Sequence, residues 1–235
     1  MTDVNTLLNE GRLLCERQQY AEAYALYGQA CAVQPDSAIA WCNRGGVAFL
    51  MGNYTDAETH YQRAHDIDPS LAEAVYGLIR LRLARRDWIG ARSMLDSHPA
   101  AGDNELDAER HYLKGIACEN LGEIETAIAA YRIAVSRRYA PAQRVLLRLL
   151  LQQKQILEAL DLCFAMASDA KTRWKLVAVC LRESDGDASA YDRAAHHFLA
   201  SYQWAYAARV TAHAQRVFPN LDLSAWPALK ESSWF

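Results

Sequence analysis

One fixed repeat spacing constrains this chain more than any other feature of its sequence. Pro35 and Pro69 lie one repeat length apart, and the residues before Pro35 match those before Pro69 position by position. Such a fixed period is the mark of a repeat architecture, in which each unit packs on its neighbours. Tyr20 recurs as Tyr54 at the same offset, and so do four further residues: Gly11 as Gly45, Ala23 as Ala57, Tyr27 as Tyr61, and Ala30 as Ala64.

Each repeat is expected to be a pair of antiparallel helices. Apolar residues recur at steps of three and four, as one face of a helix requires. The segments 17–20 and 51–54 have the length and composition of tight turns between helices. Small residues such as Gly45 and Ala57 let two helices approach closely, and a proline ends each unit because it cannot continue a helix.

The second repeat resembles a known family at nearly every position. It carries Trp-Cys-Asn-Arg-Gly at 41–45, Gly52-Asn-Tyr54, Ala57, Tyr61, Ala64 and Asp68-Pro69. This pattern resembles the tetratricopeptide repeat (TPR). The resemblance implies an all-α fold: a right-handed superhelical solenoid of helix–turn–helix hairpins with a concave face, here with a degenerate C-terminal half.

The register predicts three regions. Residues 1–139 are expected to hold TPR units at about 4–37, 38–71, 72–105 and 108–139. Residues 140–219 are expected to form degenerate TPR-like helical units, and residues 220–235 a C-terminal capping tail. Within the degenerate region, the stretch from Thr172 to Glu183 predicts one helix without a partner helix.

The bulk properties favour a cytoplasmic protein. The chain has 235 residues, 51% of them hydrophobic, and a formal net charge of −3. This balance provides no concentrated positive field for nucleic acid or an anionic membrane surface. The first residues do not read as a signal peptide. The most apolar run, Val145 to Leu151, is too short to span a bilayer.

The sequence offers no pattern for catalysis or metal binding. It has no P-loop, dinucleotide fingerprint or nucleophile elbow. The six cysteines are scattered singly, and none of the seven histidines lies at a zinc-ligand spacing. We therefore expect a protein that is not an enzyme and that has no cofactor, no metal and no catalytic residue.

The TPR resemblance implies that a ligand lies on the first helices of the units. The candidate peptide- or protein-binding residues of this concave face are Arg12, Asn43, Phe49, Tyr76, Arg80, Tyr112, Arg144 and Arg148. Some TPR domains grip the acidic tails of heat-shock chaperones through a two-carboxylate clamp. At the corresponding positions, Leu8, Arg12, Asn43, Glu73 and Gly77, only Asn43 matches, so we reject that role.

The expected function is a non-catalytic protein-protein interaction module: a scaffold, adaptor or chaperone. Its expected partner is a peptide or helix with aromatic anchors and acidic flanks. Tyr76 and Tyr112, with Arg80, Arg144 and Arg148, would make a partly aromatic, partly basic groove. Aromatic and arginine side chains are enriched at binding hot spots, and arginine can bind a carboxylate through two hydrogen bonds. Two alternatives stay open: a structural protein that self-assembles into homo-oligomers, and a regulatory subunit of an enzyme complex. The tail residues Trp226, Trp234 and Phe235 are expected either to cap the last repeat or to act as a latch on a neighbouring copy.

Overall fold

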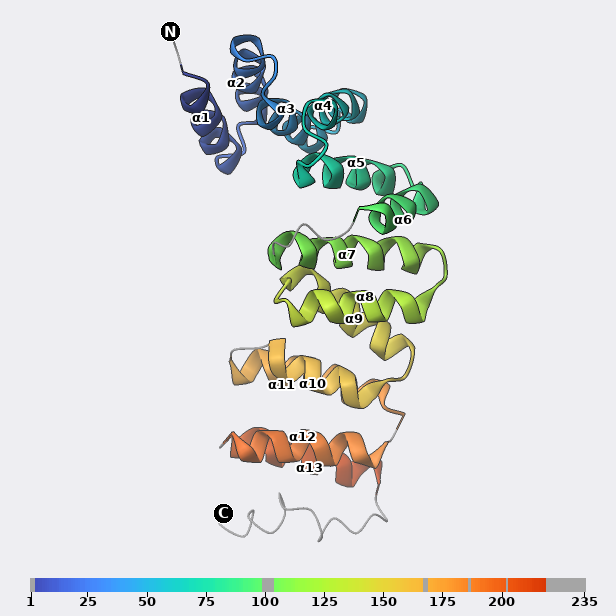
Figure 1. Cartoon of the computed structure of the whole chain (residues 1–235). Coiled ribbons are helices and arrows are strands. Elements are labelled where there is room, and N and C mark those ends of the chain that lie inside the picture. Colours follow the sequence, from blue (N-terminus) through green and yellow to red (C-terminus); the bar gives the residue numbers. More distant parts are fainter. Residues whose placement is uncertain (1–2, 99–103, 167–168, 186, 202, 219–235) are drawn as a thin grey trace. The chain divides into compact units, whose positions relative to one another are not determined.

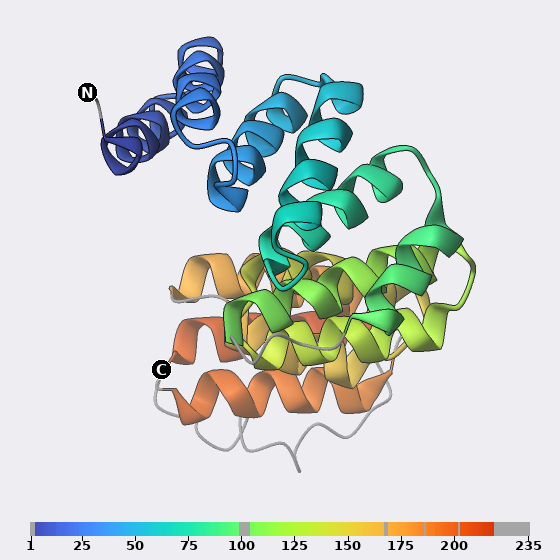
Figure 2. The ribbon, with the colours of Figure 1, turned by 45° about the horizontal axis from the view of Figure 1, so that its top comes forward.

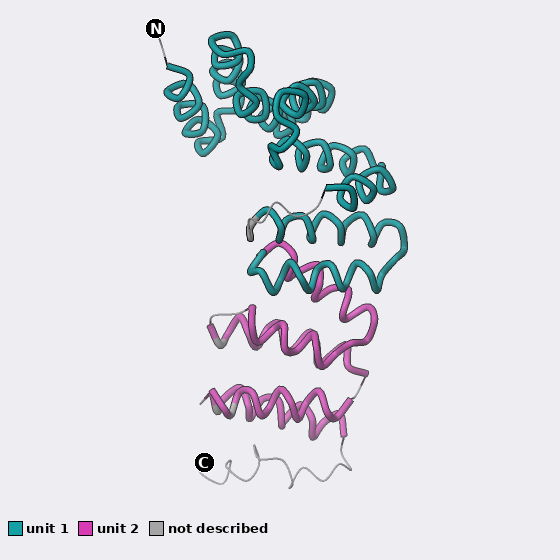
Figure 3. The backbone as a smooth tube through the Cα atoms, viewed as in Figure 1, with its two compact units in different colours: residues 1–139 teal, residues 140–235 magenta. Residues whose placement is uncertain are grey.

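The computed structural model describes residues 3–98, 104–166, 169–185, 187–201 and 203–218. The chain divides into two compact units, residues 1–139 and 140–235 (Figure 3). Every regular element in the described ranges is an α-helix (Figures 1 and 2), which confirms the all-α prediction. None of these helices has the length and apolar character needed to cross a membrane.

In the described part of the first unit, helices follow one another as antiparallel pairs. The strongest pairings are α1 with α2, α3 with α4, and α7 with α8. The helices are α1 (Val4–Glu16), α2 (Tyr20–Val33), α3 (Ala38–Leu50), α4 (Tyr54–Ile67), α5 (Ala72–Ala84), α6 (Trp88–Ser97), α7 (Asn104–Asn120) and α8 (Ile124–Ser136).

Close helix approach in this unit depends on glycines that face buried tyrosine rings. A Cβ atom placed on Gly45 of α3 would lie 2.9 Å from the ring of Tyr61 on α4. One placed on Gly77 of α5 would lie 2.4 Å from the same ring. The Tyr61 side chain, 3% exposed, therefore occupies a space that both glycines leave open. The same relation joins Gly11 with Tyr27 and Gly115 with Tyr131.

The turns inside the first three helix pairs share a left-handed residue at the same offset. Gln18, Gly52 and Arg86 have φ angles of 61°, 79° and 62°. Along the chain they recur at the spacing that separates Pro35 from Pro69. Glycine adopts this conformation without steric cost, whereas the other two residues adopt it against their preference. The left-handed backbone conformation of this turn is therefore kept in each repeat, even where the side chain disfavours it.

The second unit contains α9 (Ala140–Gln152), α10 (Ile156–Met166), α11 (Ala170–Glu183), α12 (Ala188–Ala200) and α13 (Trp204–Val217). Helix α10 packs against α9 and α11, and α12 packs against α13. The expectation that Thr172 to Glu183 has no partner helix is therefore wrong. Its helix, α11, packs on α10 through small buried residues, among them Cys163 and Cys180.

Helices α11 and α12 contact each other through large side chains. The ring of Trp174 on α11 lies 6.1 Å from the ring of Phe198 on α12. Neither helix contains a glycine. The close glycine–tyrosine approach of the first unit is therefore absent between these two helices, and α11 is attached to the unit mainly through α10.

Candidate functional site

A pocket of about 420 Å³ lies on the first-helix side of the first unit. Helix α3 supplies most of its wall, with Asn43, Gly46 and Phe49 among the lining residues. The second-helix tyrosines Tyr27 and Tyr61 reach it from α2 and α4. Three of the residues expected on the concave face therefore share one pocket, which is lined by Cys15, Tyr27, Cys42, Asn43, Gly46, Val47, Phe49, Leu50, Tyr61, Glu73 and Arg80.

The polar groups of this pocket suit binding better than chemistry. Burial raises the pKa of the Cys42 thiol to about 12, and burial likewise raises the pKa of Tyr61 to about 12. Both groups are therefore protonated at neutral pH, and a protonated thiol is a poor nucleophile. The half-buried Asn43 side chain carries both amide donors and an acceptor, so it can bond an extended peptide backbone.

The charge of Arg80 is already balanced inside the unit. Its Nε donates a hydrogen bond of 2.8 Å to Oε1 of Glu109 on α7. The Glu109 side chain is only 14% exposed, so the pair is partly shielded from water. The carboxylate of Glu73 lines the pocket together with Arg80. The pocket therefore offers little net attraction to an acidic partner, and Arg80 acts first as a link between α5 and α7.

The other candidates of the first unit lie outside this pocket. Arg12 is exposed on α1 and forms an ion pair with Glu16 one turn further on. Tyr76 is 3% exposed in the hydrophobic core formed by α5, α6 and α7, so it is a packing residue and is not presented to a ligand. Tyr112 is half-buried, and its ring centroid lies 5.2 Å from that of Tyr139.

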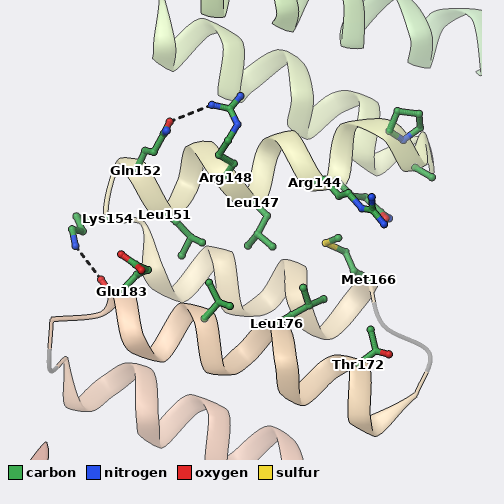
Figure 4. A pocket seen from close by; sticks show the side chains of 14 residues that line it. Arg144, Leu147, Arg148, Leu151, Gln152, Lys154, Met166, Thr172, Leu176 and Glu183 are labelled. Atoms are coloured by element: carbon green, nitrogen blue, oxygen red, sulfur yellow. Dashed lines mark hydrogen bonds between the residues drawn. The ribbon is translucent and has the colours of Figure 1, made fainter.

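A larger groove lies in the second unit, between α9 and α11. Its volume is about 1120 Å³. Figure 4 shows Leu147 and Leu151 of α9 projecting toward Leu176 of α11 across the open space. Val179, 37% exposed, and Met166 extend this apolar surface. The full lining is Ala140, Pro141, Gln143, Arg144, Leu147, Arg148, Leu151, Gln152, Lys154, Met166, Thr172, Leu176, Val179 and Glu183.

Positive charge predominates along this groove. Arg144, Arg148 and Lys154 line it, against a single carboxylate, that of Glu183. Lys154 is engaged with Asp185, at 2.7 Å. The guanidinium of Arg148 extends along α9 to Gln152, with 3.5 Å between Nη1 and Oε1 (Figure 4). Arg144 and Arg148 are exposed residues of α9 and lie at the rim of the groove.

Arg144 and Arg148, two of the expected binding residues, line this groove, whereas the sequence did not lead us to Leu147 or Leu176 of its apolar floor. Leu147 was missed because the groove needs α11 as its second wall, and α11 had no expected partner. The tail residues Trp226, Trp234 and Phe235 lie outside the described residues. In the described ranges, His, Cys, Asp and Glu side chains form no cluster of three or more that could hold a metal ion.

Comparison with known proteins supports the repeat assignment. The tetratricopeptide-repeat models match residues 38–71 and 108–140, and a TPR-repeat model matches residues 11–52. Protein O-mannosyl-transferase TMTC1 of Mus musculus is 35% identical over 78 residues, which is 33% of this chain and 8% of that protein. This chain therefore spans less than a tenth of the length of the curated relatives that it matches.

Solved structures share the fold at low sequence identity. A chain of the APC/C hetero-tetramer Cut9–Hcn1 aligns with 97% of this chain and 42% of its own length, at a TM-score of 0.62 and 17% identity. PilW, a type IV pilus biogenesis factor, aligns over 93% of this chain and 95% of its own, at a TM-score of 0.60 and 18% identity. The repeat signature, the helical hairpins and the three family models together identify the chain as a tetratricopeptide-repeat protein, and the solved structures share its fold.

Proposed function

We propose that this chain is a non-catalytic scaffold, adaptor or chaperone of the cytoplasm that binds a helical segment of a partner protein between α9 and α11. One observation carries the proposal: a groove of about 1120 Å³ whose floor is apolar and whose α9 rim carries Arg144 and Arg148. An amphipathic helix places its apolar face in such a groove.

The groove has the size of a short helix. A helix about 10 Å across and roughly nine residues long fills about 1100 Å³, given a rise of about 1.5 Å per residue. Its apolar side chains would cover Leu147, Leu151 and Leu176. Full burial of each large apolar side chain contributes about 1.5–3 kcal/mol. Two or three such anchors contribute about 3–9 kcal/mol. This is less than micromolar binding needs once the losses on association are included, so polar contacts at the rim must supply the remainder.

Charge complementarity favours an acidic flank on that helix. Arginine pairs with carboxylates through two parallel hydrogen bonds, and a charged hydrogen bond contributes about 1.5–3 kcal/mol. Arg144 and Arg148 lie one turn apart on α9, so acidic residues one turn apart on the partner match them. Aromatic residues are the expected anchors because they bury large areas with little loss of conformational entropy.

The pocket of the first unit serves a secondary role in this proposal. Its volume of about 420 Å³ suits one or two side chains rather than a helix. We propose that Asn43 bonds the backbone of an adjoining extended segment and that Phe49 packs against it. The repeat units predicted over 1–139, the degenerate units over 140–219 and the capping tail over 220–235 are part of the same proposal.

The test uses peptides selected from a random library displayed on phage, with the full chain as bait. Selected peptides are titrated by fluorescence anisotropy against the wild type and the Arg144→Glu, Arg148→Glu variant. We expect acidic, amphipathic sequences whose affinity falls about tenfold or more in the variant. The matched control is Arg209→Glu, Arg216→Glu, the same change of charge on exposed residues of α13, which should leave the affinity unchanged.

Other outcomes discriminate between the alternatives. Equal loss in both double variants indicates a general effect of charge and contradicts binding in the groove. Loss with Asn43→Ala alone places the main site in the first unit; Arg80 is left intact because its ion pair links α5 and α7. Failure to select any peptide, together with a mass that rises with concentration in sedimentation, supports the self-assembly alternative instead.

A further inference from the structure

Two cysteines of the second unit meet in its interior. Cys163 lies on α10 and Cys180 on α11, and their Sγ atoms are 3.4 Å apart. Both residues are fully buried. They are the only cysteines in the sequence after residue 139. The remaining four, Cys15, Cys31, Cys42 and Cys118, lie on four different helices of the first unit.

We propose that Cys163 and Cys180 are a redox-active pair that forms a disulfide and thereby tethers α11 to α10. A disulfide has an S–S distance of about 2.05 Å, so the two sulfur atoms need to approach by about 1.4 Å. Helices α10 and α11 already pack against one another, which makes a shift of side chains the main adjustment required. The proposal is independent of any ligand in the groove.

The contact between the two thiols supports an oxidation in two steps. Either thiol can donate a hydrogen bond to the other, and the bond favours the thiolate of the acceptor. The thiolate of one cysteine attacks a peroxide oxygen first, which gives a sulfenic acid and releases water after protonation. The sulfur of the other cysteine then attacks the sulfenic sulfur and expels the second water. In total, two thiols and one hydrogen peroxide give one disulfide and two waters.

Access to the buried pair requires a local opening, and α11 is the element placed to open. Its main packing is on α10, and its smaller contact with α12 includes that between the rings of Trp174 and Phe198. Proteins open in local units whose stability lies below that of the whole. The same helix supplies Leu176 and Val179 to the groove wall. A tether to α10 would therefore hold that wall in place.

The first experiment maps the bond in the full chain. Native protein is treated with hydrogen peroxide, the remaining thiols are alkylated after denaturation, and the peptides are analysed by mass spectrometry without reduction. We expect a linked peptide that joins Cys163 to Cys180 and four alkylated cysteines in place of six. A reducing agent should restore all six. Random linkage among the cysteines, or oxidation of Cys163 and Cys180 no faster than of the others, would overturn the proposal.

Two variants and a second readout make the result specific. Cys180→Ser should abolish the linked peptide and keep five alkylated cysteines, whereas Cys118→Ser, a change at a buried cysteine of the first unit, should leave the link intact. Amide hydrogen exchange is measured on the wild-type protein, so this readout does not depend on the folding of any variant. Exchange in α11 should slow in the oxidised protein relative to the reduced one. Equal exchange in α11 would contradict the tether.

Discussion

The close approach of helices at Tyr61 gives a quantitative prediction for two single substitutions. Gly77→Ala places a methyl group 2.4 Å from the Tyr61 ring, whereas Gly46→Ala meets nothing nearer than the Tyr61 hydroxyl at 3.6 Å. Both glycines lie in the interior of a helix, α5 and α3 respectively. The two substitutions therefore share the same gain in helix propensity and differ in steric fit.

The magnitudes follow from these two effects. Replacing glycine by alanine inside a helix stabilises it by about 0.5–1 kcal/mol. Adding a methyl group to a filled core costs about 1–3 kcal/mol, because the buried Tyr61 ring must move. We expect Gly46→Ala to stabilise the unit by up to about 1 kcal/mol. Gly77→Ala should lower the free energy of unfolding by about 1–3 kcal/mol relative to it, since propensity cancels in the difference.

Urea unfolding followed by circular dichroism measures this difference as a shift of the midpoint at constant slope. The Tyr61→Leu background provides the control, because loss of the ring removes the obstacle. There Gly77→Ala should lose most of its cost, which gives a coupling energy between the two positions. If Gly77→Ala is as stable as Gly46→Ala, or if its cost persists without the ring, the packing argument is refuted.

Three further predictions rest on charge and on the tail. Burial and the nearby charge of Arg44 lower the pKa of His60 below its ordinary 6.5, so the unfolded chain takes up the proton first as pH falls below about 6.5. Stability should therefore decline below that pH, and urea titrations at pH 7.5 and 5.5 should show a smaller decline for His60→Gln. Glu109→Gln should lower the free energy of unfolding by about 1–3 kcal/mol in the same assay, because it leaves the half-buried Arg80 without its carboxylate. Glu58→Gln breaks an exposed ion pair with Arg85 and should lower the free energy of unfolding by less than about 1 kcal/mol. Deletion of residues 224–235 should lower the melting temperature if the tail caps the last repeat, whereas monomerisation in sedimentation with an unchanged melting temperature identifies an intermolecular latch.

The repeated hairpins could be predicted from the sequence because their packing leaves a local signature. The separation along the chain between Gly45 and Tyr61 equals that between Gly11 and Tyr27. The contact between each glycine and its ring forms within a single hairpin. The fixed repeat spacing therefore records a physical requirement that every such unit satisfies on its own.

The candidate site could be predicted only in part, because it depends on contacts between units. Arg80 was expected to face a partner, yet Glu109, on the first helix of the next pair, already pairs with it. Tyr76 carries the chemistry of a binding anchor, but α6 and α7 bury it. Nothing in the pattern around either residue reports which helix packs against it.

The second unit shows the same limit more strongly. Its helices α11 and α12 have no glycine, so they lack the close approach that creates the family pattern. Large rings such as those of Trp174 and Phe198 fill the wider space, and many combinations of large side chains can do so. The groove beside Leu147 and the contact between Cys163 and Cys180 both depend on where α11 lies, which no such pattern reports.

Site-specific photo-cross-linking tests the central claim most directly. A benzophenone amino acid replaces Val179, an exposed residue of the groove, or Val217, a similarly exposed residue of α13 outside it. Each protein is irradiated with a peptide selected on the wild-type chain. The proposal predicts a cross-link from position 179, lost on adding the Arg144→Glu, Arg148→Glu pair, and none from position 217. Equal cross-linking from both positions, or none from position 179 while the peptide stays bound, would contradict binding between α9 and α11.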